Sequence, residues 1–221
     1  MNRRWLTRAL AAGAVVASLG VAPPADAGTV EASVLDDKGK PVEDAVVYLV
    51  APTPRGAAGR ATLDQQNKEF LPHVLPVVVG AAVTFPNNDN IRHNVYSVSP
   101  AKKFELPLYI GTPAAPVVFD KPGVVVLGCN IHDWMLAYVY VLSTPYFTKT
   151  GTDGRARVAD VPAGVWEVRV WHPRQRDATE KTGQPLTLAD GDTGPLAFKV
   201  RLKGEWRVPR REGGRYEHPQ H

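Results

Sequence analysis

Short apolar runs of strand length recur along most of the chain, and they constrain its fold more than any other feature. Turn clusters rich in Gly, Pro, Asn and Asp separate these runs, and no segment sustains a long apolar period of 3.6 residues. Runs rich in valine and other β-formers occupy residues 30–34, 45–50, 74–79, 117–119, 124–127, 136–142 and 165–170. The pattern predicts an all-β protein made of sandwiches or Greek-key barrels, with few and short helices.

The beginning of the chain has the composition of an export signal. Arg3, Arg4 and Arg8 precede a small apolar stretch at residues 9–21, and residues 25–27 read Ala-Asp-Ala, a cleavage motif. We therefore expect a cleaved signal peptide, a periplasmic location and no stable membrane span, since the apolar stretch is short. Removing three Arg and one Asp lowers the formal charge from +4 to +2. The remaining charge gives little support for nucleic-acid binding.

A single cysteine, Cys129, excludes an internal disulfide and stands in a suggestive neighbourhood. His132 follows at +3, Met135 follows at +6, and His93 lies upstream as a candidate for a second imidazole. Thiolate, two imidazoles and a weak thioether make the trigonal site with an axial methionine that binds copper in electron-transfer proteins. Structural zinc takes no thioether, and one cysteine excludes cysteine-ligated iron–sulfur clusters. Buried inert cysteine is the plain alternative for Cys129, but the neighbours at +3 and +6 favour a metal ligand.

The ligand loop lies between two apolar runs, at residues 124–127 and 136–142. A short loop between two strands leaves its ligands little freedom to move when copper changes oxidation state. Such an arrangement suits an electron shuttle better than a catalyst. An oxidase or nitrite reductase would need a second copper centre, and the chain lacks enough matched ligands for one.

The motif Gly128-Cys129-x-x-His132-x-x-Met135, together with His93-Asn94-Val95, resembles the cupredoxin family of plastocyanin and azurin. Its short gap between His and Met is similar to the amicyanin subgroup, and the wider pattern resembles the bacterial proteins called methylamine-utilisation or plastocyanin-like. The resemblance implies a Greek-key barrel and one type 1 copper held by His93, Cys129, His132 and Met135. It also implies that Asn94 ties the two ligand loops together, and that the protein partner is a donor dehydrogenase or a cytochrome.

In the amicyanin pattern, prolines surround the loop histidine. This chain departs from it at two residues, Ile131 before His132 and Asp133 after it. Asp133 places a carboxylate beside His132, which would favour Cu(II), lower the reduction potential and select a basic partner. We expect Trp134 to pack over the site, with a docking surface as the alternative. His73 is expected to be structural, with a supporting or partner-binding role as the alternative, and His172 is expected to close the last sandwich strand.

Two distant segments, residues 28–49 and 152–170, resemble the opening and closing halves of a carboxypeptidase-regulatory-like, transthyretin-type β-sandwich. The copper-type motifs fall between them, in a gap the size of a small domain. Two consecutive β-domains, or one larger cupredoxin with a C-terminal extension, are the alternatives to an insertion. We expect a signal peptide at 1–27, a discontinuous sandwich at 28–52 and 144–203, a cupredoxin domain at 53–143 and a flexible basic tail at 204–221.

The sequence thus favours a periplasmic blue copper protein that carries single electrons between redox partners and is not an enzyme. A periplasmic copper storage or delivery protein is the second hypothesis, since the same ligands would hold exchangeable metal. A non-redox module for interactions at the cell envelope is the third.

Overall fold

The computed structural model describes residues 27–50, 58–113, 115–189 and 194–204. The predicted signal peptide, apart from its last residue, and the predicted tail, apart from its first, lie outside the described residues. Within the described ranges no helix is long and apolar enough to cross a membrane.

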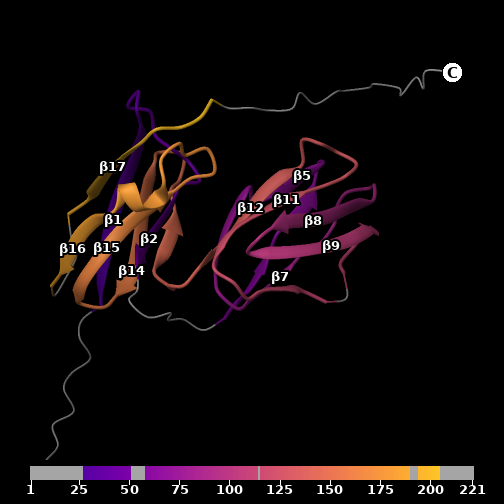
Figure 1. Ribbon diagram of the computed structural model, residues 1–221, viewed down its shortest axis with the longest axis horizontal. Helices are drawn as coiled ribbons and strands as arrows, with labels where there is room; N and C mark the ends of the chain where they lie inside the picture. The colour runs from indigo at the N-terminus through magenta and orange to yellow at the C-terminus, as the bar shows by residue number, and fades with distance from the viewer. Residues whose placement is uncertain (1–26, 51–57, 114, 190–193, 205–221) are drawn as a thin grey trace, which may run out of the picture.

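Strands from both ends of the described chain share two sheets, drawn in indigo and in orange to yellow in Figure 1. One sheet has the order β14-β1-β17, and the other has the order β13-β2-β15-β16. The short 3-10 helix η1 (Thr179–Thr182) contacts β15. These strands are β1 (Gly28–Asp36), β2 (Val46–Val50), β13 (Phe147–Lys149), β14 (Arg155–Val161), β15 (Gly164–Trp171), β16 (Gln184–Leu188) and β17 (Leu196–Val200). Val30, Leu49, Val170 and Phe198 lie in their common core.

The strands between these segments form a second arrangement, magenta to salmon in Figure 1. A five-stranded sheet has the order β6-β12-β11-β8-β9, and a three-stranded sheet has the order β10-β7-β3. The strands are β3 (Arg60–Thr62), β6 (Val74–Val78), β7 (Ala81–Thr84), β8 (His93–Ser99), β9 (Lys102–Tyr109), β10 (Val117–Phe119), β11 (Gly123–Gly128) and β12 (Leu136–Leu142). A separate hairpin is formed by β4 (Asp64–Gln66) and β5 (Glu69–Leu71). Leu63, Phe85, Phe119 and Leu127 lie in a second core, which also contains Cys129 and Met135.

Two strands are apolar on both faces because each faces two different cores. In β2, Val47 and Leu49 point into the first core, whereas Val46 and Tyr48 point into a third cluster. In β12, Ala137, Val139 and Val141 point into the second core, whereas Leu142 belongs to the third cluster and Tyr138 and Tyr140 pack against it. Side chains alternate across a strand, so a continuous apolar run requires cover on both sides. We call the third cluster the seam; it comprises Val46, Tyr48, Val50, Val74, Tyr138, Tyr140, Leu142, Phe147 and Trp171.

The prediction of an all-β protein is confirmed, and each predicted apolar run falls largely within a strand. Strands β8 and β9 did not stand out in the sequence. In β9, Lys102, Lys103, Glu105 and Pro107 interrupt the apolar pattern. This strand lies at a sheet edge, where charges and proline are tolerated because one side makes no ladder. The domain boundaries and the family of the first arrangement stay predictions.

Candidate metal centre

Three segments of the second arrangement converge on one group of side chains. His93 begins β8, Cys129 directly follows β11, and His132 lies in the loop that leads to β12. One ligand atom from each of these residues lies within 4.8 Å of the others. Met135 is 2% exposed and packs in the same core as Cys129.

The loop that carries these ligands is closed by regular strand pairing. Strands β11 and β12 are antiparallel, and their last pair is Gly128 with Leu136. Inside the loop, the Met135 amide donates a 2.9 Å hydrogen bond to the His132 carbonyl. A Cβ on Gly128 would stand 2.9 Å from the ring of Tyr96, so a glycine before the cysteine lets that ring lie across the strand. The loop is therefore closed at its base by the pairing of β11 with β12 and held inside by one backbone hydrogen bond.

His93 is buried, and its two ring nitrogens have different surroundings. Nε2 lies 2.7 Å from a carboxylate oxygen of Asp89, whereas Nδ1 lies 4.0 Å from Sγ of Cys129. The Asp89 carboxylate also accepts hydrogen bonds from the amides of Asn67 at 2.7 Å and Lys68 at 2.8 Å. Burial alone would raise the pKa of Asp89, but its hydrogen bonds to the Lys68 amide and to His93 outweigh burial and lower the pKa. An ionised Asp89 accepts a hydrogen bond from Nε2–H of His93. Nδ1 is then the unprotonated ring nitrogen, and it faces Cys129.

His132 is half-buried, and its Nδ1 is a buried polar atom that has no hydrogen-bond partner among the described residues. Burial, followed by the charges of His93 and Lys68, lowers the pKa of His132 and so favours the neutral ring. Its ring centroid lies 5.0 Å from that of His93 and 5.0 Å from that of Trp134. A neutral imidazole with an unprotonated nitrogen is in the state that a metal requires.

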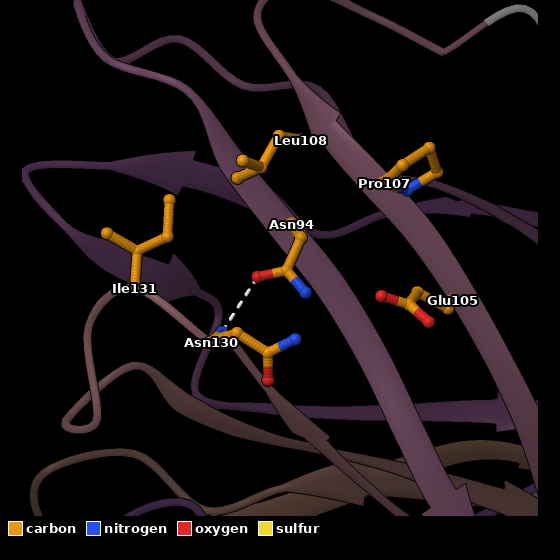
Figure 2. Close-up of a pocket in the computed structure, with 6 residues that line it drawn as sticks. All are labelled: Asn94, Glu105, Pro107, Leu108, Asn130 and Ile131. Carbon is orange, nitrogen blue, oxygen red and sulfur yellow. Dashed lines mark hydrogen bonds between the residues drawn. The ribbon is translucent and has the colours of Figure 1, made fainter.

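Asn94 joins the two ligand segments, as the resemblance implied. Its side-chain oxygen accepts a 2.7 Å hydrogen bond from the Asn130 amide, which is the dashed line in Figure 2. The indole of Trp134 packs against the second core and donates a 3.1 Å hydrogen bond to the Lys68 carbonyl. Asp133 is exposed beside His132.

A shallow pocket of about 440 Å³ lies beside the ligand loop (Figure 2). Ile131 and Leu108 are 49% and 51% exposed, which gives the pocket a largely apolar rim. The lining residues are Asn94, Glu105, Pro107, Leu108, Asn130 and Ile131. Solvent-facing apolar side chains therefore stand next to the loop that carries His132.

The other histidines singled out in the sequence stand apart from this group. Nδ1 of His73 lies 3.0 Å from the Leu136 carbonyl, and its ring packs edge-on against Tyr138. His172 is buried just after β15, where its Nδ1 accepts a hydrogen bond from the Arg174 amide at 3.1 Å. Burial lowers the pKa of His172 to about 4. Both residues make structural contacts. The expectation that His172 closes the last sandwich strand is wrong, because β16 and β17 follow it in the chain and join the same two sheets.

The types of donor atom in the cluster narrow the choice of metal. It contains one thiol sulfur, two imidazoles and a buried thioether, from Cys129, His93, His132 and Met135. Soft sulfur donors with imidazole in a trigonal His2Cys arrangement are those of a type 1 copper site with a weak axial methionine. The four side chains are therefore consistent with type 1 copper.

Asp89 and the turn at Asn67 and Lys68 did not stand out in the sequence as part of this site. Residues 86–90 have the composition of a solvated turn, which is how the sequence places them. The available signal is a carboxylate four residues before a ligand histidine. Spacing alone does not show that the chain folds back to join the two.

No protein-family model matches this chain, and no curated protein matches it. Among solved structures, it is similar to a purple cupredoxin from Nitrosopumilus maritimus, with 26% identity over 37% of this chain and 99% of that one, at a TM-score of 0.33. It is also similar to an amicyanin variant in its reduced Cu(I) form, with 24% identity over 43% of this chain and 98% of that one, at a TM-score of 0.34. A copper-containing nitrite reductase from Thermus scotoductus is 22% identical over 49% of this chain, at a TM-score of 0.36, and the match spans 28% of the reductase.

Proposed function

We propose that this chain is a periplasmic type 1 copper protein of the cupredoxin family that carries single electrons between redox partners and is not an enzyme. One observation carries the proposal: a ligand atom from each of His93, Cys129 and His132 lies within 4.8 Å of the other two. Met135 is buried in the same core. Copper, when bound, supplies one-electron exchange between Cu(II) and Cu(I).

The surroundings of the ligands favour electron carriage over bond-making chemistry. His93 and Cys129 are buried, so a substrate has no direct contact with either residue. His132 is half-buried, and its ring is the ligand most accessible to an approaching protein. Strand pairing and the hydrogen bond from Asn130 to Asn94 hold the donors in place, so little movement accompanies a change in charge.

We infer a protein redox partner that approaches the ligand loop: a donor dehydrogenase, a cytochrome, or each in turn. The half-exposed apolar side chains of Ile131 and Leu108 lie beside this loop, and Asp133 adds a carboxylate to the same region. An apolar contact with a charge at its edge suits a transient complex. The periplasmic location is inferred from the N-terminal sequence pattern alone.

We propose that the cupredoxin domain, residues 53–143, is inserted into a carboxypeptidase-regulatory-like sandwich of residues 28–52 and 144–203. The support is the sheet order, in which β1 pairs with β14 and β17, and β2 pairs with β13 and β15. Segments on either side of the insertion thereby share one core.

The test is copper reconstitution of the purified protein without its signal peptide, followed by visible absorption and electron paramagnetic resonance. We expect an intense thiolate-to-copper band in the wild type that is lost in Cys129→Ala and retained in His73→Ala, the control. A wild type without the band, or a band that survives in Cys129→Ala, would overturn the proposed centre.

Voltammetry and chelator competition then separate carriage from copper delivery. A carrier gives a reversible one-electron wave and holds its copper against a moderate chelator. A delivery protein would release copper to the chelator rapidly. The buried positions of His93 and Cys129 favour the first result.

A further inference from the structure

The carboxylate of Asp89 contacts both the ligand histidine, His93, and a distant turn of the chain at Asn67 and Lys68. It is 2.7 Å from Nε2 of His93, and it accepts the amide hydrogen bonds of Asn67 and Lys68. Its own backbone is fixed as well, because the Asp89 amide donates a 3.0 Å hydrogen bond to the side-chain oxygen of Asn87. Asn87 in turn donates to the Ile91 carbonyl at 2.9 Å.

The turn that supplies these amides belongs to the β4–β5 hairpin. Asn67 and Lys68 have positive φ angles of 55° and 58°, the backbone of a tight two-residue hairpin turn. The same turn is held from the other ligand segment, since the Trp134 indole donates to the Lys68 carbonyl. The hairpin tip therefore bridges the segment that carries His93 and the loop that carries His132.

We propose that Asp89 is a positioning residue of the copper centre: it holds His93 with Nδ1 toward the metal, and the Asn67–Lys68 turn holds Asp89. The proposal rests on the proposed function. A carboxylate that accepts the Nε2 proton leaves an unprotonated Nδ1, and partners of this kind fix the tautomer and the orientation of ligand histidines. Its negative charge also stabilises Cu(II) more than Cu(I), and so keeps the reduction potential low.

The plain alternative is that Asp89 only anchors the hairpin and does not determine the orientation or the tautomer of His93. Two substitutions separate these roles because they remove different properties of the carboxylate. Asp89→Asn can keep the oxygen that accepts from Nε2 and from the Lys68 amide, but it loses the charge and the acceptor for the Asn67 amide. Asp89→Ala loses all of these. Asp64→Asn is the matched control, since Asp64 lies on the same hairpin and accepts from the Gln65 amide and the Asn88 side chain.

The first measurement uses metal-free protein, with ¹⁵N and ¹H NMR of the imidazole of His93. We expect the tautomer protonated on Nε2 in the wild type, in Asp64→Asn and in Asp89→Asn, and a loss of that preference in Asp89→Ala. An unchanged Nε2-protonated ring in a folded Asp89→Ala variant would overturn the positioning role. This result does not depend on whether the protein binds copper.

The second measurement uses the copper form, with voltammetry and Cu(II) competition. We expect the reduction potential to rise in both Asp89 variants, and a tenfold loss of preference for Cu(II) over Cu(I) corresponds to about 59 mV. Cu(II) affinity should fall about 10–100-fold in Asp89→Ala, the usual effect of removing a supporting partner of a ligand. Wild-type potential and affinity in the Asp89 variants would contradict the proposal.

The two measurements also separate this inference from the proposed function. If the wild type takes up no copper, the proposed function fails, and the NMR result then decides only whether Asp89 orients the ring of His93. If Asp89→Ala does not fold by near-ultraviolet circular dichroism, Asp89→Asn decides: a raised potential with a retained tautomer supports the proposal, and an unchanged potential contradicts it.

Discussion

At the scale of single residues, the four donors depend on neighbours that hold them. Asn94 supplies the acceptor for the Asn130 amide, one residue after Cys129, and Asp89 supplies the acceptor for His93. Gly128 leaves room for the ring of Tyr96 across the strand. The donor types explain why copper would bind, and these neighbours explain why the donors stay in one arrangement.

We predict that Asn94→Ala destabilises the fold by about 1–3 kcal/mol, because it removes the buried side chain that accepts the part-buried hydrogen bond of the Asn130 amide. The measurement is urea unfolding of the metal-free protein. Asn130→Ala is the control, since it removes an exposed side chain and keeps the backbone amide. Equal stability of the two variants would contradict the assigned hydrogen bond.

At the scale of elements, a strand's neighbours decide which of its faces is buried. The alternation in β2 and β12 assigns one face of each strand to its own core and the other to the seam. Turns between strands are equally constrained. Gly154 has a φ of +72°, and its carbonyl accepts the Val34 amide at 2.8 Å, which joins the start of β14 to β1.

Gly154→Ala should destabilise the protein by about 2–4 kcal/mol, through an unfavourable positive φ and through a Cβ that would meet a backbone oxygen. That oxygen belongs to Val34 and would lie 2.6 Å away. Gly39→Ala is the matched control, with a φ of +79° and nothing within 4 Å of the added Cβ. Its cost should be only about 1–2 kcal/mol in the same denaturant titration. Equal costs would show that the contact with Val34 relaxes without penalty.

At the scale of the whole molecule, the seam joins two cores that the chain builds from different segments. Trp171 packs against Tyr140 with ring centroids 4.7 Å apart and against Tyr138 at 6.1 Å. The Tyr140 hydroxyl donates a 3.2 Å hydrogen bond to that of Tyr48, which lies in β2. The seam therefore links the sheet that contains β12 to the sheet that contains β2.

Trp171→Ala should cost about 2–4 kcal/mol, since removing a large aromatic side chain from a packed position costs about 3–5 kcal/mol when burial is complete. Trp171 is only partly buried. Differential scanning calorimetry should resolve two thermal transitions in the variant, because the two cores lose their shared contact. Val165→Ala, at an 81% exposed position of the same strand, is the control and should leave the trace unchanged. A single unshifted transition in Trp171→Ala would show that the seam does not couple the cores.

The sequence alone determined the all-β class and the donor types. Both are local properties: apolar alternation needs only neighbouring residues, and Cys129, His132 and Met135 lie within one short loop. The distant partner His93 was a candidate from the sequence, and the family resemblance strengthened its assignment as a ligand. A link between the two ligand loops through Asn94 was expected from that resemblance, and the structure shows which partner it uses, the Asn130 amide.

The tertiary structure decided what joins segments far apart in the chain. It brought the Asn67–Lys68 turn to Asp89 and turned the tyrosines of β12 toward Trp171. None of these contacts leaves a local signature, because a carboxylate in a polar turn and a tyrosine in a strand have the same sequence context whether they face solvent or another segment. The type of each residue determines which donor atoms are available. The contacts that hold those donors depend on which distant segments the folded chain brings beside them.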